Sequence, residues 1–307
     1  MKNKEWLGLP CKGGKFRLLY VLLPLIKYLA LESPQRAFLD VCGGGGKLAC
    51  NVAIGFLYDK VLYNEYERGM TALMACLTDE ALVQKVIRIV DRLLAVSLSY
   101  DPKDVFNAAN DQRNRPGLDK IRAAAYTFYC IYASFSNDRQ EFSETKKIEI
   151  FNQGRWRKIL LKYPSRIRRM LVTCGSCFDV LERYINYSDI TSFIDPPYYN
   201  TNVYENDWSP VDYERLRSIL ARTKNKIILC GREADKMVYD CVLSQGWFRT
   251  SLGYVSTSSN CHDGSLSEEF IWTNFPVPEF ITDMVENESL KQEKRRWEKA
   301  MRNGEIA

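Results

Sequence analysis

Long hydrophobic runs and histidine are both scarce in this sequence. The longest apolar stretch, Leu18 to Leu31, contains Pro24 and Lys27 and is too short to span a bilayer. It also lacks the small-residue cleavage pattern of a signal peptide, so we expect a cytoplasmic protein. With a single histidine in the chain, the close pair Cys174 and Cys177 has no second pair to complete a zinc site, and we expect no metal.

Regular cysteine spacing is absent, although the chain has ten cysteines. Several of them lie inside apolar runs, where a thiol acts as a small hydrophobic group. We therefore expect a reducing compartment and no disulfide framework. Low-complexity runs are absent too, and 46% hydrophobic with 26% charged residues is an ordinary composition for a folded protein.

Positive charge is concentrated in one segment of a chain whose net charge is only +5. Residues 146–169 hold nine Lys or Arg and a single acid, Glu149, with Phe151, Trp156 and Tyr163 interleaved. This mixture is typical of a surface that neutralises phosphates and stacks on bases, and a solvated helix face is the alternative. The predicted phosphate contacts are Arg155, Arg157, Lys158, Arg166, Arg168 and Arg169.

Short apolar runs predict an α/β fold with an insert. Residues 37–41 and 61–63 favour buried strands, and helical patterns follow them, the first from about Lys47, which gives a βαβ unit. From about Glu67 to Arg169 the pattern is helical and rich in charge, so we expect a mostly helical insert.

The α/β pattern then resumes. Strands are expected at 190–194, 227–230, 251–255 and 270–274, with a helix around 213–220 and a charged helix or tail at 286–302. The predicted fold is a Rossmann-like α/β sheet with helices on both faces. Its predicted parts are a discontinuous α/β domain of residues 1–66 and 165–280, an inserted domain of residues 67–164, and a charged C-terminal helix or tail at 281–307.

A glycine-rich turn follows the first predicted strand. Its four glycines, residues 43–46, let the backbone adopt positive φ and approach a ligand beside the positive end of the next helix. Glu65, at the tip of the second strand, is placed to accept hydrogen bonds from ribose hydroxyls. NAD and S-adenosylmethionine both fit, and a glycine connection without ligand is the alternative. A phosphate-binding P-loop fits poorly, because Val41 and Leu48 occupy its Gly and Ser/Thr positions.

A second motif, Asp195-Pro196-Pro197-Tyr198, stands directly after the predicted strand 190–194. Ligands of α/β sheets bind at the carboxyl ends of the strands. The Asp195 carboxylate and the Pro196 carbonyl are two acceptors suited to the N–H bonds of an exocyclic amine, Pro197 stiffens the turn, and Tyr198 offers a face to a flipped base. An ordinary turn between strand and helix is the alternative.

With these motifs in this order, the sequence resembles the Dam-type family of N6-adenine DNA methyltransferases. That family runs from a glycine-rich cofactor turn through an inserted target-recognition domain to Asp-Pro-Pro-Tyr. Residues 12–15 look like its opening Gly-Gly-Lys element, and residues 268–275 are similar to a late strand of its sheet. The resemblance implies S-adenosylmethionine as cofactor, double-stranded DNA as substrate, and direct methyl transfer to N6 of adenine. The cofactor-binding positions it implies are Cys11, Lys15, Asp40, Gly44, Gly46, Glu65, Cys177 and Asp195.

The sequence departs from the family pattern at several positions. Cys11 and Cys42 replace aromatic residues beside the cofactor, and Ser176 or Cys177 replaces an acidic residue before the catalytic strand. The insert matches only loosely around residues 126–138, so the resemblance does not identify a recognition sequence.

Four other functions share some of these features. An N4-cytosine enzyme uses the same chemistry on a similar amine. A dehydrogenase leaves Asp195 to Tyr198 without a role, and a C5-cytosine enzyme needs a Pro-Cys pair after the cofactor turn, whereas Pro10-Cys11 precedes it. A catalytically retired DNA-binding protein of the same fold is the alternative from another class. Charge alone does not separate DNA from RNA, and a cognate restriction endonuclease is a further expected partner.

Overall fold

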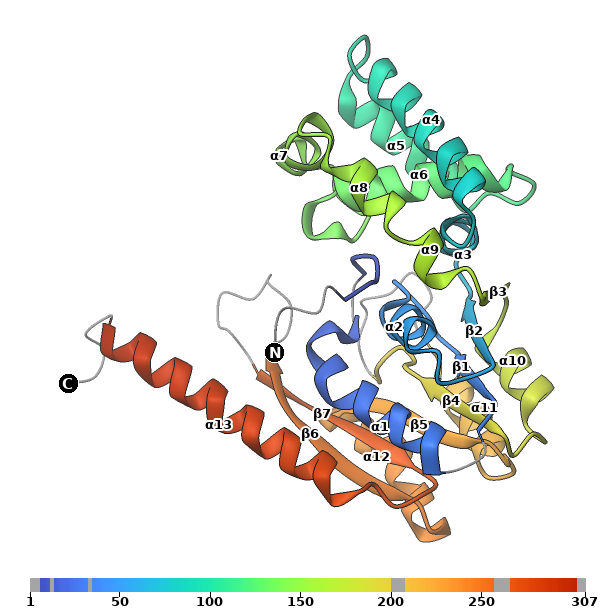
Figure 1. Cartoon of the computed structure of the whole chain (residues 1–307), viewed down its shortest axis with the longest axis vertical. Helices are drawn as coiled ribbons and strands as arrows, with labels where there is room; N and C mark the ends of the chain where they lie inside the picture. The colour runs from blue at the N-terminus through green and yellow to red at the C-terminus, as the bar shows by residue number, and fades with distance from the viewer. Residues whose placement is uncertain (1–5, 12–13, 33–34, 200–207, 257–265, 303–307) are drawn as a thin grey trace. The chain divides into compact units, whose positions relative to one another are not determined.

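The computed structural model describes residues 6–11, 14–32, 35–199, 208–256 and 266–302 (Figure 1). Its strands form a mixed seven-stranded sheet in the order β3-β2-β1-β4-β5-β7-β6, accompanied by helices. This confirms the predicted Rossmann-like α/β class. Contacts divide the chain into two compact units, the first made of Met1–Phe16 and Pro34–Tyr184 and the second of Arg17–Ser33 and Ile185–Ala307.

The strands of the first unit are parallel and end in register. Asp40 pairs with Tyr63, and Glu65 pairs with Cys174, so the residues that leave β1, β2 and β3 emerge at the same edge. Helix α2 follows β1, as predicted from Lys47 onward. The elements are β1 (Ala37–Asp40), α2 (Lys47–Gly55), β2 (Lys60–Glu65), α3 (Arg68–Leu77), β3 (Met170–Cys174) and α10 (Cys177–Tyr184).

The insert of the first unit is helical, as the sequence indicates. The only strand-like pairing among its described residues is an isolated antiparallel bridge between Ser134 and Phe142. Helix α6 packs against α3, α4 and α5, and Figure 1 shows α3 and α9 as the segments that link this group to β2 and β3. Its elements are α4 (Glu80–Val96), α5 (Pro102–Gln112), α6 (Lys120–Ala133), η2 (Phe135–Asn137), α7 (Glu144–Lys147), η3 (Ile148–Asn152), α8 (Arg155–Leu161) and α9 (Pro164–Ile167).

The second unit begins its sheet with two parallel strands, β4 and β5, and adds β7 and β6 antiparallel. Helix α13 packs on β6 and α1 and lies along β6 in Figure 1. It starts seven residues before the predicted Glu286. The elements are η1 (Lys15–Leu18, which begins in the first unit), α1 (Leu19–Glu32), β4 (Ile190–Ile194), α11 (Pro210–Leu220), β5 (Lys226–Arg232), η4 (Glu233–Asp235), α12 (Lys236–Tyr239), η5 (Asp240–Gln245), β6 (Phe248–Ser256), β7 (Leu266–Thr273) and α13 (Glu279–Arg302).

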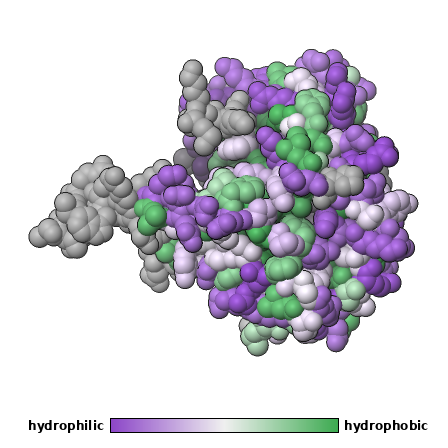
Figure 2. Space-filling model, turned by 60° about the horizontal axis from the view of Figure 1, so that its bottom comes forward, coloured by the Kyte–Doolittle hydropathy of each residue, from purple (hydrophilic) through white to green (hydrophobic). Residues whose placement is uncertain are grey.

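The apolar stretch near the N-terminus forms α1, which buries Leu19, Leu22, Leu25 and Ile26 among its residues. No helix within the described residues has the length and apolar character needed to cross a membrane. On the face shown in Figure 2, hydrophobic side chains lie in patches bordered by hydrophilic ones.

Candidate active site

The glycine turn leaves β1 and enters α2 through left-handed backbone. Gly44 has φ +49° and Gly46, the N-cap of α2, has φ +66°, values that residues with a Cβ rarely adopt. The turn is tied to its neighbours by backbone hydrogen bonds: Gly43 donates to the Asn64 carbonyl, and Gly45 accepts from Leu9, both over 2.8 Å. The turn is therefore held from β2 and from the N-terminal segment.

The four glycines of the turn differ in what a Cβ at each position would contact. A Cβ on Gly43 would lie 2.2 Å from the Tyr63 ring, and one on Gly45 would lie 2.2 Å from the Leu9 carbonyl oxygen. A Cβ on Gly46 would meet Met74 at 2.4 Å. At Gly44 only the Cys11 thiol lies nearby, at 3.4 Å, which is ordinary contact distance. Gly44 is thus the position at which a Cβ would fit, whereas at the other three the protein's own atoms occupy that space.

Glu65 closes this turn from the end of β2. Its Oε2 accepts from the Gly44 N–H over 2.7 Å, and its Oε1 accepts from the Glu67 N–H over 3.0 Å. Burial raises the pKa of Glu65, and the two backbone N–H groups and Arg139 act in the opposite direction. Each carboxylate oxygen has further lone pairs, so the group can still accept hydrogen bonds from a ligand's hydroxyls.

Two lysines and a cysteine complete what we call the glycine-turn cluster: Cys11, Lys15, Gly44, Lys47 and Glu65. Lys15 is buried, with 6% of its surface exposed, in the first turn of η1. Burial lowers the pKa of Lys47, with Cys11 raising it and Lys15 lowering it further, and burial raises the pKa of Cys11. The cluster therefore contains a carboxylate, Glu65, that can accept hydrogen bonds from ribose hydroxyls, and a buried lysine, Lys15. Lys12 and Gly13 of the predicted Gly-Gly-Lys element lie outside the described residues.

Asp40 and Cys177, two other predicted cofactor positions, contact the start of α2 and begin α10, respectively. The Asp40 carboxylate is buried and accepts from the Ala49 N–H over 3.2 Å, which satisfies the N-terminus of α2 where Gly46 offers no side chain. Cys177 is half-buried and begins α10, after the carboxyl end of β3. Its neighbour Ser176 accepts from the Phe178 N–H over 3.2 Å, as a helix-capping residue does.

The Asp195 loop, residues 195–199, leaves the carboxyl end of β4 in the second unit, where the sequence predicts it. Asp195 is half-buried directly after the fully buried strand. The Pro197 carbonyl accepts from the Tyr213 hydroxyl over 3.0 Å, so α11 holds the turn. Tyr213 also packs edge-on against Tyr199, with ring centroids 5.4 Å apart.

The Tyr198 side chain is anchored rather than open to solvent, with 4% of its surface exposed. Its hydroxyl donates to Glu269 Oε2 over 2.9 Å, and the Arg232 guanidinium lies over its ring, 4.4 Å from the centroid. A base that stacks on this ring therefore takes the other face or displaces Arg232.

Asp235 holds the backbone beside this ring. Its two carboxylate oxygens accept from the Tyr199 N–H over 2.7 Å and from the Arg232 N–H over 2.6 Å. Burial raises the pKa of Asp235 to about 6 in spite of these two bonds. The sequence does not predict a role for the side chains of Asp235 and Glu269 at this loop, because Tyr199 lies 36 residues from Asp235 and Tyr198 lies 71 residues from Glu269.

The predicted phosphate contacts on α8, on α9 and just beyond them are exposed: Arg155, Arg157, Lys158, Arg166, Arg168 and Arg169. Arg157 forms an ion pair with Asp91 and lies over the Trp156 ring. The expectation that interleaved aromatic residues stack on bases is wrong for this structure. All three rings are buried: Trp156 lies on the inner side of α8, Phe151 lies in η3, and Tyr163 follows α8 and accepts from the Gly8 N–H over 3.2 Å. The basic residues of α8 lie on its outer side.

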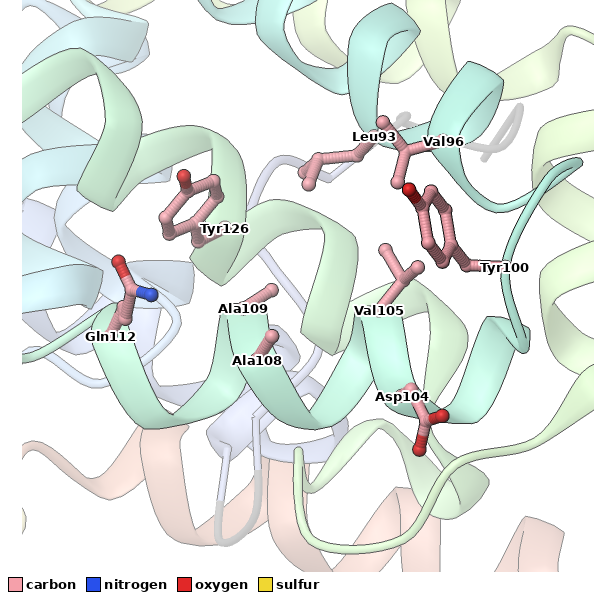
Figure 3. A pocket seen from close by; sticks show the side chains of 9 residues that line it. All are labelled: Leu93, Val96, Tyr100, Asp104, Val105, Ala108, Ala109, Gln112 and Tyr126. Carbon is pink, nitrogen blue, oxygen red and sulfur yellow. The ribbon is translucent and has the colours of Figure 1, made fainter.

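The insert also contains a pocket of about 320 Å³ between α4, α5 and α6 (Figure 3). Apolar side chains dominate its lining, including Leu93, Val96, Val105 and Ala109, with the rings of Tyr100 and Tyr126 facing it. Such a lining offers few donors to a phosphate. Across the described part of the chain, no three His, Cys, Asp or Glu side chains come together as a metal site.

Comparison with known proteins agrees with the order of these motifs. A family model described as D12 class N6 adenine-specific DNA methyltransferase matches residues 12–250, which is most of the chain and includes the span from Lys15 through the glycine turn to the Asp195 loop. No curated protein matches the chain. The chain therefore belongs to the D12 class N6 adenine-specific DNA methyltransferase family.

Proposed function

We propose that the protein transfers a methyl group from S-adenosylmethionine directly to N6 of an adenine flipped out of double-stranded DNA. The observation that carries this proposal is the placement of Asp195-Pro196-Pro197-Tyr198 at the carboxyl end of β4, in a chain of this family. Ligands of α/β sheets bind at such strand ends.

The glycine-turn cluster fits S-adenosylmethionine. At Gly44 the cofactor could approach the backbone closely. Glu65 would accept hydrogen bonds from the ribose hydroxyls of the cofactor, and Lys15 would attract its carboxylate. When bound, this cofactor supplies a methyl group activated by its sulfonium charge.

The Asp195 loop would orient the amine. The Asp195 carboxylate and the Pro196 carbonyl accept its two N–H bonds, which draws the nitrogen lone pair out of conjugation with the ring. Positive charge that develops on the nitrogen during transfer is stabilised by the same two acceptors. Tyr198 supplies the ring against which the flipped base stacks.

The insert is proposed to read the target DNA, with the exposed basic residues of α8 and α9 gripping phosphates. A restriction endonuclease that recognises the same DNA sequence is the proposed partner of this protein. Four of the described cysteines, Cys50, Cys76, Cys130 and Cys230, are buried as thiols. Thiols used as small hydrophobic groups are typical of a reducing compartment, and we infer the cytoplasm.

The test is incubation of purified protein with S-adenosylmethionine and mixed-sequence duplex DNA, followed by digestion to nucleosides and mass spectrometry. We expect N6-methyladenine from the wild type and none from Asp195→Ala. Asp283→Asn, an exposed carboxylate on α13, serves as matched control and should keep full activity. N4-methylcytosine as product, or no methylated nucleoside from the wild type, would overturn the proposal.

A further inference from the structure

Charged side chains outside the Asp195-Pro196-Pro197-Tyr198 motif contact the Asp195 loop. Glu269, on β7, is 3% exposed and divides its two oxygens between two partners. Oε2 accepts from the Tyr198 hydroxyl over 2.9 Å, and Oε1 accepts from Arg232 Nε over 3.0 Å. One buried carboxylate thus joins the loop after β4 to the end of β5.

Arg232 closes the arrangement from the opposite side. While its Nε is held by Glu269, its guanidinium lies over the Tyr198 ring at 4.4 Å from the centroid. Tyr198 is consequently held at its hydroxyl by Glu269 and across its face by Arg232. A cation over a tyrosine ring is attracted by the ring's negative face, and more strongly when the pair is shielded from water.

The backbone on either side of Tyr198 is held as well. Asp235 accepts from the Tyr199 and Arg232 N–H groups, and Tyr213 donates to the Pro197 carbonyl. With the backbone fixed at these points, the remaining freedom of Tyr198 is rotation of its side chain. The Glu269 bond to its hydroxyl and the Arg232 guanidinium over its face both restrict this rotation.

We propose that Glu269 is a positioning residue for the target base: through the Tyr198 hydroxyl and through Arg232, it holds the Tyr198 ring in the orientation that receives the flipped adenine. This inference rests on the proposed function. A base stacks on the face of an aromatic side chain, and a ring already fixed in place loses less conformational entropy when the base arrives.

The experiment uses Glu269→Gln, Tyr198→Phe and the double variant of the full chain. Tyr198→Phe removes only the hydroxyl and keeps the ring. Glu268→Gln is the control, because Glu268 is the neighbouring residue on β7 and binds Ser251 over 2.6 Å instead of the Asp195 loop. Base flipping is followed by the fluorescence of 2-aminopurine, placed at the methylated adenine, and kcat and KM are measured on the same duplex.

We expect Glu269→Gln and Tyr198→Phe each to lower the flipping signal and kcat by about tenfold, as loss of one charge-assisted hydrogen bond predicts. Since both substitutions disrupt the hydrogen bond between Tyr198 and Glu269, the double variant should lose little more than Glu269→Gln alone, which also weakens the ion pair with Arg232. Glu268→Gln should match the wild type. Affinity for S-adenosylmethionine should stay unchanged in all of them, which a general loss of folding would not allow.

Wild-type flipping and kcat in Glu269→Gln, or losses that multiply in the double variant, would overturn this proposal. If Glu269→Gln fails to fold, Tyr198→Phe decides: an unchanged flipping signal in that variant likewise overturns it. Absence of methyladenine from the wild type would instead overturn the proposed function, and this inference with it.

Discussion

The Gly44 backbone N–H donates to Glu65 Oε2 over 2.7 Å, so the glycine that the cofactor could approach and the residue that would bind its ribose are joined directly. Gly44 lies in the turn after β1 and Glu65 ends β2, and β1 and β2 pair in parallel with Asp40 opposite Tyr63. The strand register therefore fixes the distance between the turn and the carboxylate before any ligand binds.

Glu65→Gln should weaken S-adenosylmethionine binding by about tenfold or more, because an amide replaces one anionic acceptor oxygen with a donor. Burial raises the pKa of Glu65 above the ordinary value of 4.5, so the wild-type affinity should also fall as the pH is lowered toward that value and the carboxylate takes up a proton. Titration calorimetry at several pH values measures both effects. The variant should lack most of this pH dependence, and an equally steep decline in both proteins would contradict the assignment.

Gly45→Ala should destabilise the protein, although Gly45 does not require positive φ. Its Cβ would lie 2.2 Å from the Leu9 carbonyl oxygen, a backbone atom that cannot move aside without disturbing the N-terminal segment. We expect a loss of about 1–3 kcal/mol in the free energy of unfolding. Gly55→Ala is the matched control, since its Cβ would meet only Leu57 at 3.6 Å, and it should be neutral or slightly stabilising. Urea denaturation of the two variants measures the difference; similar stabilities would show that the turn adapts.

The sequence predicts the strands whose residues are all buried to a similar extent. Strand β4 is buried at every position, so its apolar run is continuous, and the observed bounds Ile190–Ile194 match the prediction. Strand β3 was missed because its burial is uneven, with Leu171 about half exposed at the end of the sheet order and a basic segment directly before it.

The candidate site was predictable where it is local. The glycine turn and the Asp195 loop are continuous motifs, whereas Glu269 lies 71 residues from Tyr198 and meets it only because β7 is inserted antiparallel beside β5. The error over Trp156 had a visible signal: Trp156 and Leu160 are spaced as i and i+4, the spacing of a buried helix face. Composition suggested base stacking, and periodicity was the better guide.

Replacing Arg155, Lys158 and Arg166 with Gln should weaken DNA binding and reduce its salt dependence. Each phosphate contact that is lost should lower the slope of log affinity against log salt by about one. These three side chains are exposed on α8 and α9. Lys60→Gln is the control, because Lys60 is exposed at the amino end of β2, away from the carboxyl ends that carry the proposed site. Fluorescence anisotropy over a range of salt concentrations gives both slopes; an unchanged slope in the triple variant would remove the basic patch from the interface.

Asp235 should make the stability of the protein depend on pH in an unusual direction. Burial raises its pKa from 3.8 to about 6, so the folded state holds a proton that the unfolded chain releases near its ordinary pKa. The resulting stability is fully present below about pH 4 and is lost as the pH rises through about 6, a change on the order of 3 kcal/mol.

Asp235→Asn cannot release this proton, and its amide oxygen still accepts one of the two backbone N–H bonds. Its stability relative to the wild type should therefore rise by that amount between about pH 4 and about pH 7, when both are unfolded by urea at each pH. Asp283→Asn, which removes an exposed carboxylate from α13, should follow the wild-type curve. Parallel curves for Asp235→Asn and the wild type would mean that Asp235 stays ionised throughout, held by the N–H groups of Tyr199 and Arg232 strongly enough to offset its burial.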